Sequence, residues 1–150
     1  MDFGVVVDGY CSDMTRTVHL GRASDEERHA YEAVLEAQEA GVAAVRAGVA
    51  THEVDQAARS VLHKAGLAEW FTHSTGHGVG LEIHEGPRLA RRPADAVKPP
   101  VEALKPGMVV TIEPGIYIPW KFGVRIEDTA VVTRAGCEIL TPSTKAWIEL

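Results

Sequence analysis

The chain has 150 residues, enough for one domain with a buried core. Its apolar content of 45%, charged content of 24% and net charge of −6 are ordinary for a globular protein, and they disfavour nucleic acid or an anionic membrane as the main partner. No apolar run reaches the roughly 20 residues that span a bilayer, and no signal peptide is visible. The two cysteines, Cys11 and Cys137, form no motif. We therefore expect a cytoplasmic protein with two reduced thiols.

The first predicted element is a β-hairpin. Residues 2–7 read as one strand, and residues 10–20 alternate in polarity as a second strand. Between them, Asp8-Gly9 is a strong signal for a two-residue loop, because both positions tolerate positive φ. With this loop, the numbers of paired residues add up to 17.

That register makes two acidic residues neighbours. Asp2 faces Thr15, and Asp2 and Asp13 become diagonal neighbours on one face, roughly 7–8 Å apart at the backbone. Two carboxylates at this distance repel each other unless a cation lies between them. A metal site is one interpretation, and the other is that one carboxylate is a solvated acid of an edge strand.

A long helix follows the hairpin. Ser24 and Glu27 have the spacing of a capping box, and a helix is predicted from there to about residue 47, ended by Gly48. Its charged face reads as solvated. The inward stripe consists of Tyr31, Val34, Leu35, Gln38, Val42 and Val45.

A second helix is predicted from Thr51, as its cap, to about residue 65, with Gly66 closing it. His52 and His63 read as surface residues of this helix rather than as ligands. Its core stripe consists of Val54, Ala58, Val61, Leu62 and Ala65.

The stretch from His73 to Glu85 holds three histidines and three glycines, and a short strand over 70–72 is predicted to lead into it. Glycine lets a backbone turn tightly or approach a ligand, and neutral imidazole is a good metal ligand and proton carrier. The alternative is a glycine-rich loop with surface histidines. His77 and His84 are seven residues apart, so a regular strand would point them to opposite faces. The chain must bend if both serve one site.

Residues 87–106 are predicted to form a loop, because prolines interrupt most of the segment. The loop is basic and could form a rim that faces a substrate, or it could be a solvated loop. Its basic residues are Arg88, Arg91, Arg92 and Lys98.

Strands are predicted over residues 108–113, 123–133 and 138–140. Glu113 and Glu127 lie on the first two of these strands, 14 residues apart. A hairpin centred on Trp120 would set the two glutamates opposite each other. The sequence thus offers a second pair of carboxylates that strand geometry can bring together.

The candidate ligands are four carboxylates and one imidazole, a set that suits two divalent cations of the manganese or cobalt kind with bridging carboxylates. A structural zinc site would need cysteines, and none is in position. No His-Glu-x-x-His helix is present, because Gly86-Pro87 follows His84-Glu85. The candidate metal ligands are Asp2, Asp13, His77, Glu113 and Glu127.

Short motifs are spread over the whole chain. They are Asp2-Phe3-Gly4, Tyr10 to Thr17, His73-x-x-Gly76-His77-Gly78-x-Gly80, His84-Glu85-x-Pro87, Gly107-Met108, Glu113-Pro114-Gly115-x-Tyr117 and Arg125-x-Glu127-Asp128. Together these motifs resemble the pita-bread metallopeptidases (creatinase/aminopeptidase fold, M24), and the resemblance covers essentially the whole chain. Within this family, the chain is more similar to the Xaa-Pro peptidases, prolidase and proline aminopeptidase, than to the methionine aminopeptidases.

The resemblance implies an α/β fold: the C-terminal portion of a pita-bread domain, with a curved, mostly antiparallel sheet and two long helices on one face. Family members carry a sizeable segment before the residue that Asp2 matches. We therefore expect residues 1–150 to be the C-terminal part of the catalytic domain. The N-terminal domain and the first part of the catalytic domain would be absent, and the full-length parent would be a homodimer.

The resemblance also implies the reaction, which is metal-dependent hydrolysis of a peptide bond preceding proline. Two divalent ions would be manganese or cobalt, with zinc or iron as alternatives. Asp2 would ligate one ion, His77 the other, and Asp13 and Glu127 would bridge both. Glu113 would ligate and act as general base toward a metal-bound hydroxide.

Three further residues receive roles from the resemblance. His84 would bind the substrate carbonyl or stabilise the tetrahedral intermediate, His73 would lie at the pocket for proline, and Arg125 would be a supporting charge. No residue securely matches the arginine that binds a dipeptide's terminal carboxylate in prolidases, since Arg91, Arg92 and Lys98 lie in that loop but out of register. A non-catalytic binding module on the same fold, or an inactive fragment, is the alternative. Creatinase-like chemistry is disfavoured because it needs no metal ligands.

Overall fold

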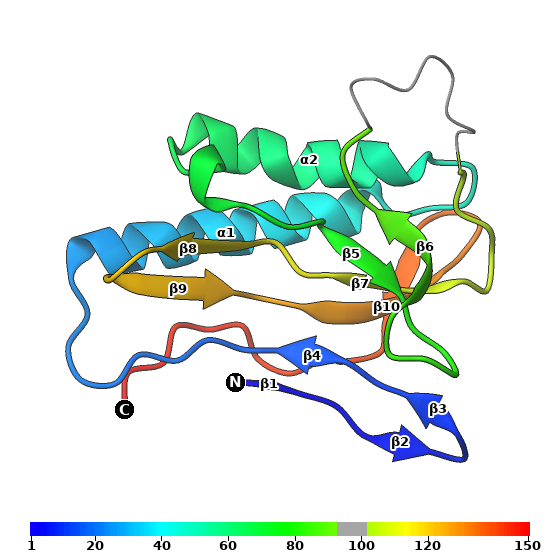
Figure 1. Cartoon of the computed structure of the whole chain (residues 1–150), viewed down its shortest axis with the longest axis horizontal. Coiled ribbons are helices and arrows are strands. Elements are labelled where there is room, and N and C mark those ends of the chain that lie inside the picture. The colour runs from blue at the N-terminus through cyan, green and yellow to red at the C-terminus, as the bar shows by residue number, and fades with distance from the viewer. Residues whose placement is uncertain (93–101) are drawn as a thin grey trace.

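Two helices packed against each other cover one side of an antiparallel sheet in the computed structural model, which describes residues 1–92 and 102–150 (Figure 1). The central sheet has the order β11-β10-β7-β5-β6, and β1–β4, β2–β3 and β8–β9 form two-stranded ribbons. The strands are β1 (Asp2–Phe3), β2 (Val6–Val7), β3 (Tyr10–Cys11), β4 (Met14–Thr15), β5 (Gly76–Gly78), β6 (Glu85–Leu89), β7 (Val109–Ile112), β8 (Gly115–Ile118), β9 (Phe122–Arg125), β10 (Asp128–Val132) and β11 (Cys137–Ile139). The helices are α1 (Asp25–Ala44), α2 (Thr51–Lys64) and the 3-10 helix η1 (Ala68–Trp70). The predicted α/β fold class is confirmed.

The N-terminal hairpin has the predicted register. Asp2 pairs with Thr15 across β1 and β4, and β2 and β3 continue the same register up to the Asp8-Gly9 turn. The prediction of one strand over 2–7 is wrong, because the ladder is interrupted between β1 and β2. There Val5 donates its N–H to Ser12 Oγ (3.1 Å) and accepts from Ser12 N (2.9 Å), so a side chain replaces one ladder bond.

Helix α1 begins with the predicted capping box. Ser24 N donates to Glu27 Oε2 (2.8 Å), and Glu27 N donates to Ser24 Oγ (3.3 Å). The helix ends at Ala44, three residues before the predicted end, because Val45 adopts an extended conformation. Gly48, with φ of 87°, belongs to the connection between the helices.

Helix α2 begins one residue away from the predicted cap. Thr51 is the first helical residue, and the N-cap is Ala50, whose N–H donates to Glu53 Oε2 (3.1 Å). Gly66 follows the helix with φ of 74°, as a closing glycine should. No helix in the described part of the chain is both long and apolar enough to cross a membrane.

Two of the predicted elements between the helices and β7 differ from the structure. Residues 70–72 do not form a strand, and η1 ends at Trp70. The predicted loop over 87–106 begins within a strand, β6, because Pro87 lies at a register shift on the edge of the sheet, where its missing N–H is tolerated. The rest of that loop from 93 to 101, with Lys98, lies outside the described residues.

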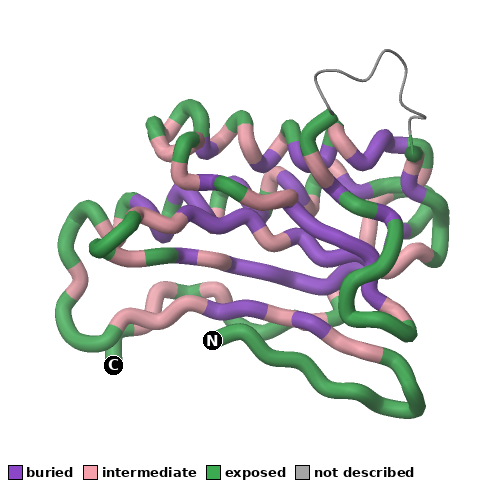
Figure 2. Tube along the Cα trace, in the orientation of Figure 1, coloured by how far each residue is buried: buried purple, intermediate pink, exposed green. Residues whose placement is uncertain are grey.

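The core lies where the helices meet the strands, as the buried segments in Figure 2 show. One cluster joins the two helices to the β8–β9 ribbon, and the other joins them to β7 and β10. The ribbon from β1 to β3 lies apart from this core, and residues 1–10 are exposed. Fully buried members include Val34, Leu62, Phe71, Ile112, Ile116 and Ile126.

Strand β5 approaches β7 so closely that a side chain at Gly76 has no space. A Cβ at Gly76 would lie 1.9 Å from the carbonyl oxygen of Thr111. We expect Gly76→Ala to lower the free energy of unfolding by about 3 kcal/mol, because β5 must move away from β7. Gly136→Ala is the matched control, since a Cβ there meets no atom within 4 Å. Urea unfolding measures both, and equal stabilities would contradict the prediction.

Candidate metal centre

Two strand pairs place Glu113 opposite Glu127. Ile112 pairs with Asp128 between β7 and β10, and Gly115 pairs with Arg125 between β8 and β9. Residue numbers add up to 240 in both pairs, so the predicted hairpin centred on Trp120 is confirmed. Glu113 and Glu127 themselves lie between the two ladders.

The two glutamates are not bonded to each other through the backbone. Glu113 N donates to Thr75 O (2.8 Å), and Glu127 N donates to Thr15 O (3.1 Å). The predicted strand over 123–133 is therefore split into β9 and β10. At this split, the backbone of Glu127 bonds to the N-terminal ribbon and the backbone of Glu113 bonds to the residue before β5.

The structure brings all five predicted ligands together. Three groups of side chains each offer ligand atoms that lie within 4.8 Å of one another, and three of the five residues belong to two groups. Asp2 lies in β1, Asp13 directly before β4, His77 in β5, and the two glutamates between the ladders. The groups are Asp13, His77 and His84; His77, Glu113 and Glu127; and Asp2, Asp13 and Glu127.

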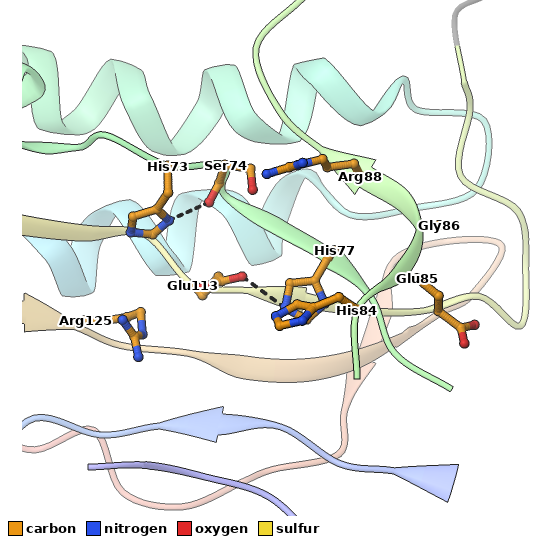
Figure 3. Close-up of a pocket in the computed structure, with 9 residues that line it drawn as sticks. All are labelled: His73, Ser74, His77, His84, Glu85, Gly86, Arg88, Glu113 and Arg125. Atoms are coloured by element: carbon orange, nitrogen blue, oxygen red, sulfur yellow. Dashed lines mark hydrogen bonds and ion pairs between the residues drawn. The ribbon is translucent and has the colours of Figure 1, made fainter. Parts of the chain in front are cut away.

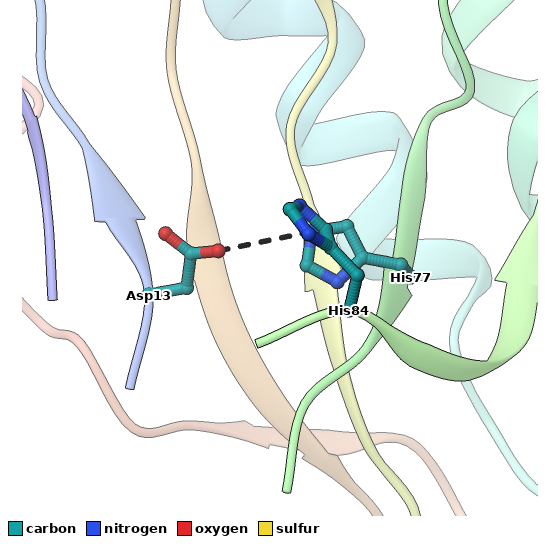
Figure 4. Close-up of side chains that lie close together, drawn as sticks. All are labelled: Asp13, His77 and His84. Carbon is teal, nitrogen blue, oxygen red and sulfur yellow. Dashed lines mark ion pairs between the residues drawn. The ribbon is translucent and has the colours of Figure 1, made fainter. Parts of the chain in front are cut away.

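The imidazole of His77 lies between two of the carboxylates. Its Nε2 is 3.3 Å from Glu113 Oε1 and 3.7 Å from Asp13 Oδ2 (Figure 4). Its Nδ1 is 3.0 Å from the carbonyl oxygen of Gly78, which accepts a hydrogen bond and holds the tautomer with a free Nε2. That nitrogen is the one that faces the carboxylates, as a metal ligand requires.

His84 joins His77 because the chain bends between β5 and β6. The ring centroids of the two histidines are 4.3 Å apart, although their sequence separation would place them on opposite faces of one strand. Gly80 N donates to Glu82 O (3.1 Å) within this bend. The predicted bend is therefore present. His84 also belongs to one group of candidate metal ligands, a role that the sequence analysis had not given it.

A chain of hydrogen bonds connects His73 to Asp2. Tyr117 OH is 3.1 Å from His73 Nε2 and accepts from Arg125 Nη1 (2.8 Å). Arg125 Nη2 donates to Asp2 Oδ2 (2.6 Å), which holds the carboxylate of an otherwise exposed residue. The sequence reasoning gave Tyr117 no role. The sequence does contain one signal for the position of Tyr117. The residue paired with it across the β8–β9 ribbon is Gly123, where a Cβ would lie 3.0 Å from the Tyr117 ring.

A buried ion pair on α2 fixes the segment that carries His73. Asp55 is 1% exposed, and it accepts from Arg59 Nε (2.6 Å) and from Thr75 N (3.1 Å). Arg59 also donates to the carbonyl oxygens of Phe71 (2.9 Å) and His73. The sequence gave no sign of this contact, because it joins residues of a helix to a segment without regular structure.

The centre opens into a cavity of about 680 Å³, and Figure 3 shows the side chains that surround it. Arg88, which the sequence had placed in a loop, extends from β6 along one side of this cavity. Together with Arg125 it supplies the cationic side chains of the cavity wall in the described part of the chain. The lining residues are His73, Ser74, His77, His84, Glu85, Gly86, Arg88, Glu113 and Arg125.

Crowding of the carboxylates changes their protonation. Burial, together with the charges of Glu113, Asp13 and Asp2, raises the pKa of Glu127 to about 8, against a hydrogen bond from Thr15 that lowers it. Burial and the neighbouring charges of Asp2 and Glu113 also raise the pKa of Asp13. These carboxylates repel one another in a half-buried space, so a divalent cation among them is strongly favoured. Hence the donor set fits metal ions.

Comparison with known proteins also indicates a metal-binding protein. Residues 1–134 match the sequence model of metallopeptidase family M24. The Xaa-Pro dipeptidase of Pyrococcus furiosus is 46% identical over 141 residues, which are 94% of this chain and 38% of that protein.

Solved structures of other proteins are also similar to this chain in sequence and fold. The Xaa-Pro dipeptidase from Bacillus anthracis has a TM-score of 0.92 at 50% identity over 99% of this chain and 40% of that one. The X-Pro aminopeptidase from Thermotoga maritima has a TM-score of 0.90 at 42% identity, with 99% and 40% covered. The chain thus spans about 40% of the length of these relatives.

The raised pKa of Glu127 predicts how stability depends on pH without metal. Between the ordinary pKa of glutamate and about 8, the unfolded chain loses a proton that the folded chain keeps. The free energy of unfolding should therefore fall, by on the order of 2–4 kcal/mol, as pH rises from 5 to 8. Urea unfolding in EDTA measures this. Glu127→Gln is the control and should have a much smaller slope, whereas an unchanged slope would contradict the assignment.

Proposed function

The chain belongs to metallopeptidase family M24, and on this basis we propose that its metal centre serves the hydrolysis of a peptide bond preceding proline. The observation that carries the proposal is that four carboxylates and one imidazole lie in overlapping groups of possible metal ligands beside a cavity. The names of the two Xaa-Pro relatives support proline as the residue after the cleaved bond. The substrate is a short proline-containing peptide.

These residues would hold two divalent ions, manganese or cobalt. Asp2 would ligate one ion and His77 the other, and Asp13 and Glu127 would be shared by both. The overlapping ligand groups support this arrangement, because Asp13 and Glu127 each take part in two of them. Oxygen donors with one imidazole suit manganese and cobalt better than a structural zinc. When bound, the ions lower the pKa of a water molecule and polarise the peptide carbonyl.

Glu113 is the general base. Its Oε1 is 3.3 Å from His77 Nε2 and accepts from Thr111 Oγ1 (3.3 Å), and its side chain lines the cavity. The carboxylate is thus held on one side, and its other oxygen has no hydrogen bond to the described residues. That oxygen takes the proton of the attacking water and passes it to the leaving proline nitrogen.

The remaining cavity residues orient the substrate. His84 lies against His77 and donates to the substrate carbonyl or to the developing oxyanion. His73 lies at the far side of the cavity beside Tyr117 and forms the proline side of the pocket. Arg125 contacts Asp2 rather than the cavity centre, so its role is to hold that ligand.

Arg88 binds the terminal carboxylate of a dipeptide substrate. Arg125 is engaged by Asp2, Tyr117 and Thr15, whereas Arg88 has no hydrogen-bonding partner among the described residues. Arg88 lines the same cavity as His73, on the proline side of the metal ligands. A guanidinium in that position suits a carboxylate in two-point contact. Arg88 therefore fills the position for which the sequence offered no match.

The replacement Glu113→Gln tests the catalytic proposal. The wild-type protein should bind two Mn²⁺ ions per chain and hydrolyse Ala-Pro. Glu113→Gln should still bind Mn²⁺ but lose turnover by about 10²–10⁴-fold, since an amide takes up no proton. Isothermal titration and an assay of released proline measure the two properties. Failure of the wild-type protein to bind Mn²⁺, Co²⁺ or Zn²⁺ at any loading would instead favour a non-catalytic binding module.

The role of Arg88 is testable without turnover in the Glu113→Gln background. Adding Arg88→Met should weaken the binding of Ala-Pro about tenfold or more, because a charged hydrogen bond is lost. The binding of Ala-Pro-amide, which lacks the carboxylate, should not change. Arg134→Met is the control, since Arg134 is exposed and remote from the cavity. An equal loss for both peptides would refute carboxylate binding by Arg88.

A further inference from the structure

Arg16 is a buried arginine that does not line the cavity. It follows Thr15 at the end of β4 and is 7% exposed. Its Nη1 donates to the carbonyl oxygens of Thr15 (2.9 Å) and Glu127. One guanidinium group thus binds both residues of the isolated β-bridge between Thr15 and Glu127. This β-bridge joins the N-terminal ribbon to the segment that carries Glu127.

The same guanidinium also fixes the C-terminal segment. Arg16 Nε donates to Thr144 O (3.0 Å), and Nη2 donates to the carbonyl oxygens of Thr141 and Ser143 (3.0 Å each). Every nitrogen of the side chain therefore has an acceptor. A side chain in this position could not point its donors in so many directions unless it were planar and branched.

The charge of Arg16 is balanced by Asp128, which is fully buried beside Glu127. Arg16 Nη2 donates to Asp128 Oδ1 (2.6 Å), and the other oxygen accepts from Lys145 Nζ (2.6 Å) and Gln38 Nε2 (3.0 Å). Arg16 and Lys145 thus share one carboxylate. Of the two cations, Arg16 is the one that also contacts the backbone of Glu127.

We infer that Arg16 is a positioning residue of the metal centre, which sets the distance between the carboxylates of Asp13 and Glu127 by clamping the backbones of their two strands. The inference rests on the proposed metal centre. Glu127 lies where the ladder between β7 and β10 has ended, so its position depends on the bridge to Thr15. The Thr15 hydroxyl donates to Glu127 Oε2 (2.7 Å), so a shift of the bridge moves the ligand oxygen itself.

The clamp also restrains Asp13. Thr129 Oγ1 donates to the carbonyl oxygen of Asp13 (2.6 Å), and Thr129 N donates to Thr141 Oγ1 (3.0 Å), in the segment that Arg16 holds. Both ligands that we propose to bridge the two ions are thus attached to one guanidinium. Bridging requires this, because an error in their separation weakens binding of both ions together.

The test compares Arg16→Lys with Lys145→Met. Lys145→Met removes one of the two cations that pair with Asp128, whereas Arg16→Lys keeps the positive charge and removes the forked contact with Thr15 and Glu127. Isothermal titration with Mn²⁺ should show an affinity about tenfold or more lower in Arg16→Lys, the usual loss when a group that orients a ligand is removed. In Lys145→Met the affinity should stay within about twofold of wild type. The electron paramagnetic resonance signal of two coupled Mn²⁺ ions should weaken in Arg16→Lys alone.

The outcomes separate this inference from the proposed function. Unchanged affinity in Arg16→Lys, or an equal loss in both variants, overturns the positioning role. A wild-type protein that binds no Mn²⁺ overturns the metal centre and the inference with it. If circular dichroism shows Arg16→Lys unfolded, the double variant Arg16→Gln/Asp128→Asn decides, because it removes both members of the buried ion pair and leaves only Lys145, which is 26% exposed, without its carboxylate. The same loss of affinity supports the inference, and wild-type affinity in that variant overturns it.

Discussion

Repulsion among carboxylates in a half-buried space is the constraint on which the rest of this structure depends. Folding places Asp13, Glu113 and Glu127 within reach of one another, and the raised pKa of Glu127 records the cost of doing so. The ladder of the hairpin around Trp120 is interrupted at the two glutamates, and the backbone N–H of each donates to a different neighbouring segment.

The arginines near the centre are arranged to leave this repulsion in place. Arg16 is neutralised by Asp128, and Arg125 is paired with Asp2 at the exposed end of the cluster. In the described part of the chain, neither guanidinium forms an ion pair with the carboxylate of Asp13 or Glu127. A protein cation there would stabilise the metal-free fold and compete with divalent ions. The chain instead uses arginines to hold backbones, as Arg59 does beside His73 and Arg16 does beside Glu127.

Much of this arrangement was predictable, because it depends on local turn chemistry. Asp8-Gly9 and the hairpin around Trp120 each fix a register, and the two registers bring four carboxylates into two pairs, Asp2 and Asp13 as diagonal neighbours and Glu113 opposite Glu127. The parts that sequence reasoning missed depend on contacts between distant segments. Nothing near Asp55 in the sequence indicates that this helical residue binds the backbone of Thr75. Residues 85–89 form strand β6 despite Pro87 because they pair with β5, with a register shift that accommodates the proline. Motif spacing locates the ligands, whereas long-range packing decides what supports them.

The hairpin between Glu113 and Glu127 also determines where the chain can change length during evolution. Its tip at Trp120 is fully exposed and touches no part of the centre, so residues inserted there lengthen the ribbon and leave both glutamates opposed. A single residue gained or lost within either arm has a different effect. It would turn one glutamate to the other face of its strand, because side chains alternate along a strand. Homologous chains should therefore vary in length at the tip of this ribbon and keep the number of residues in each arm.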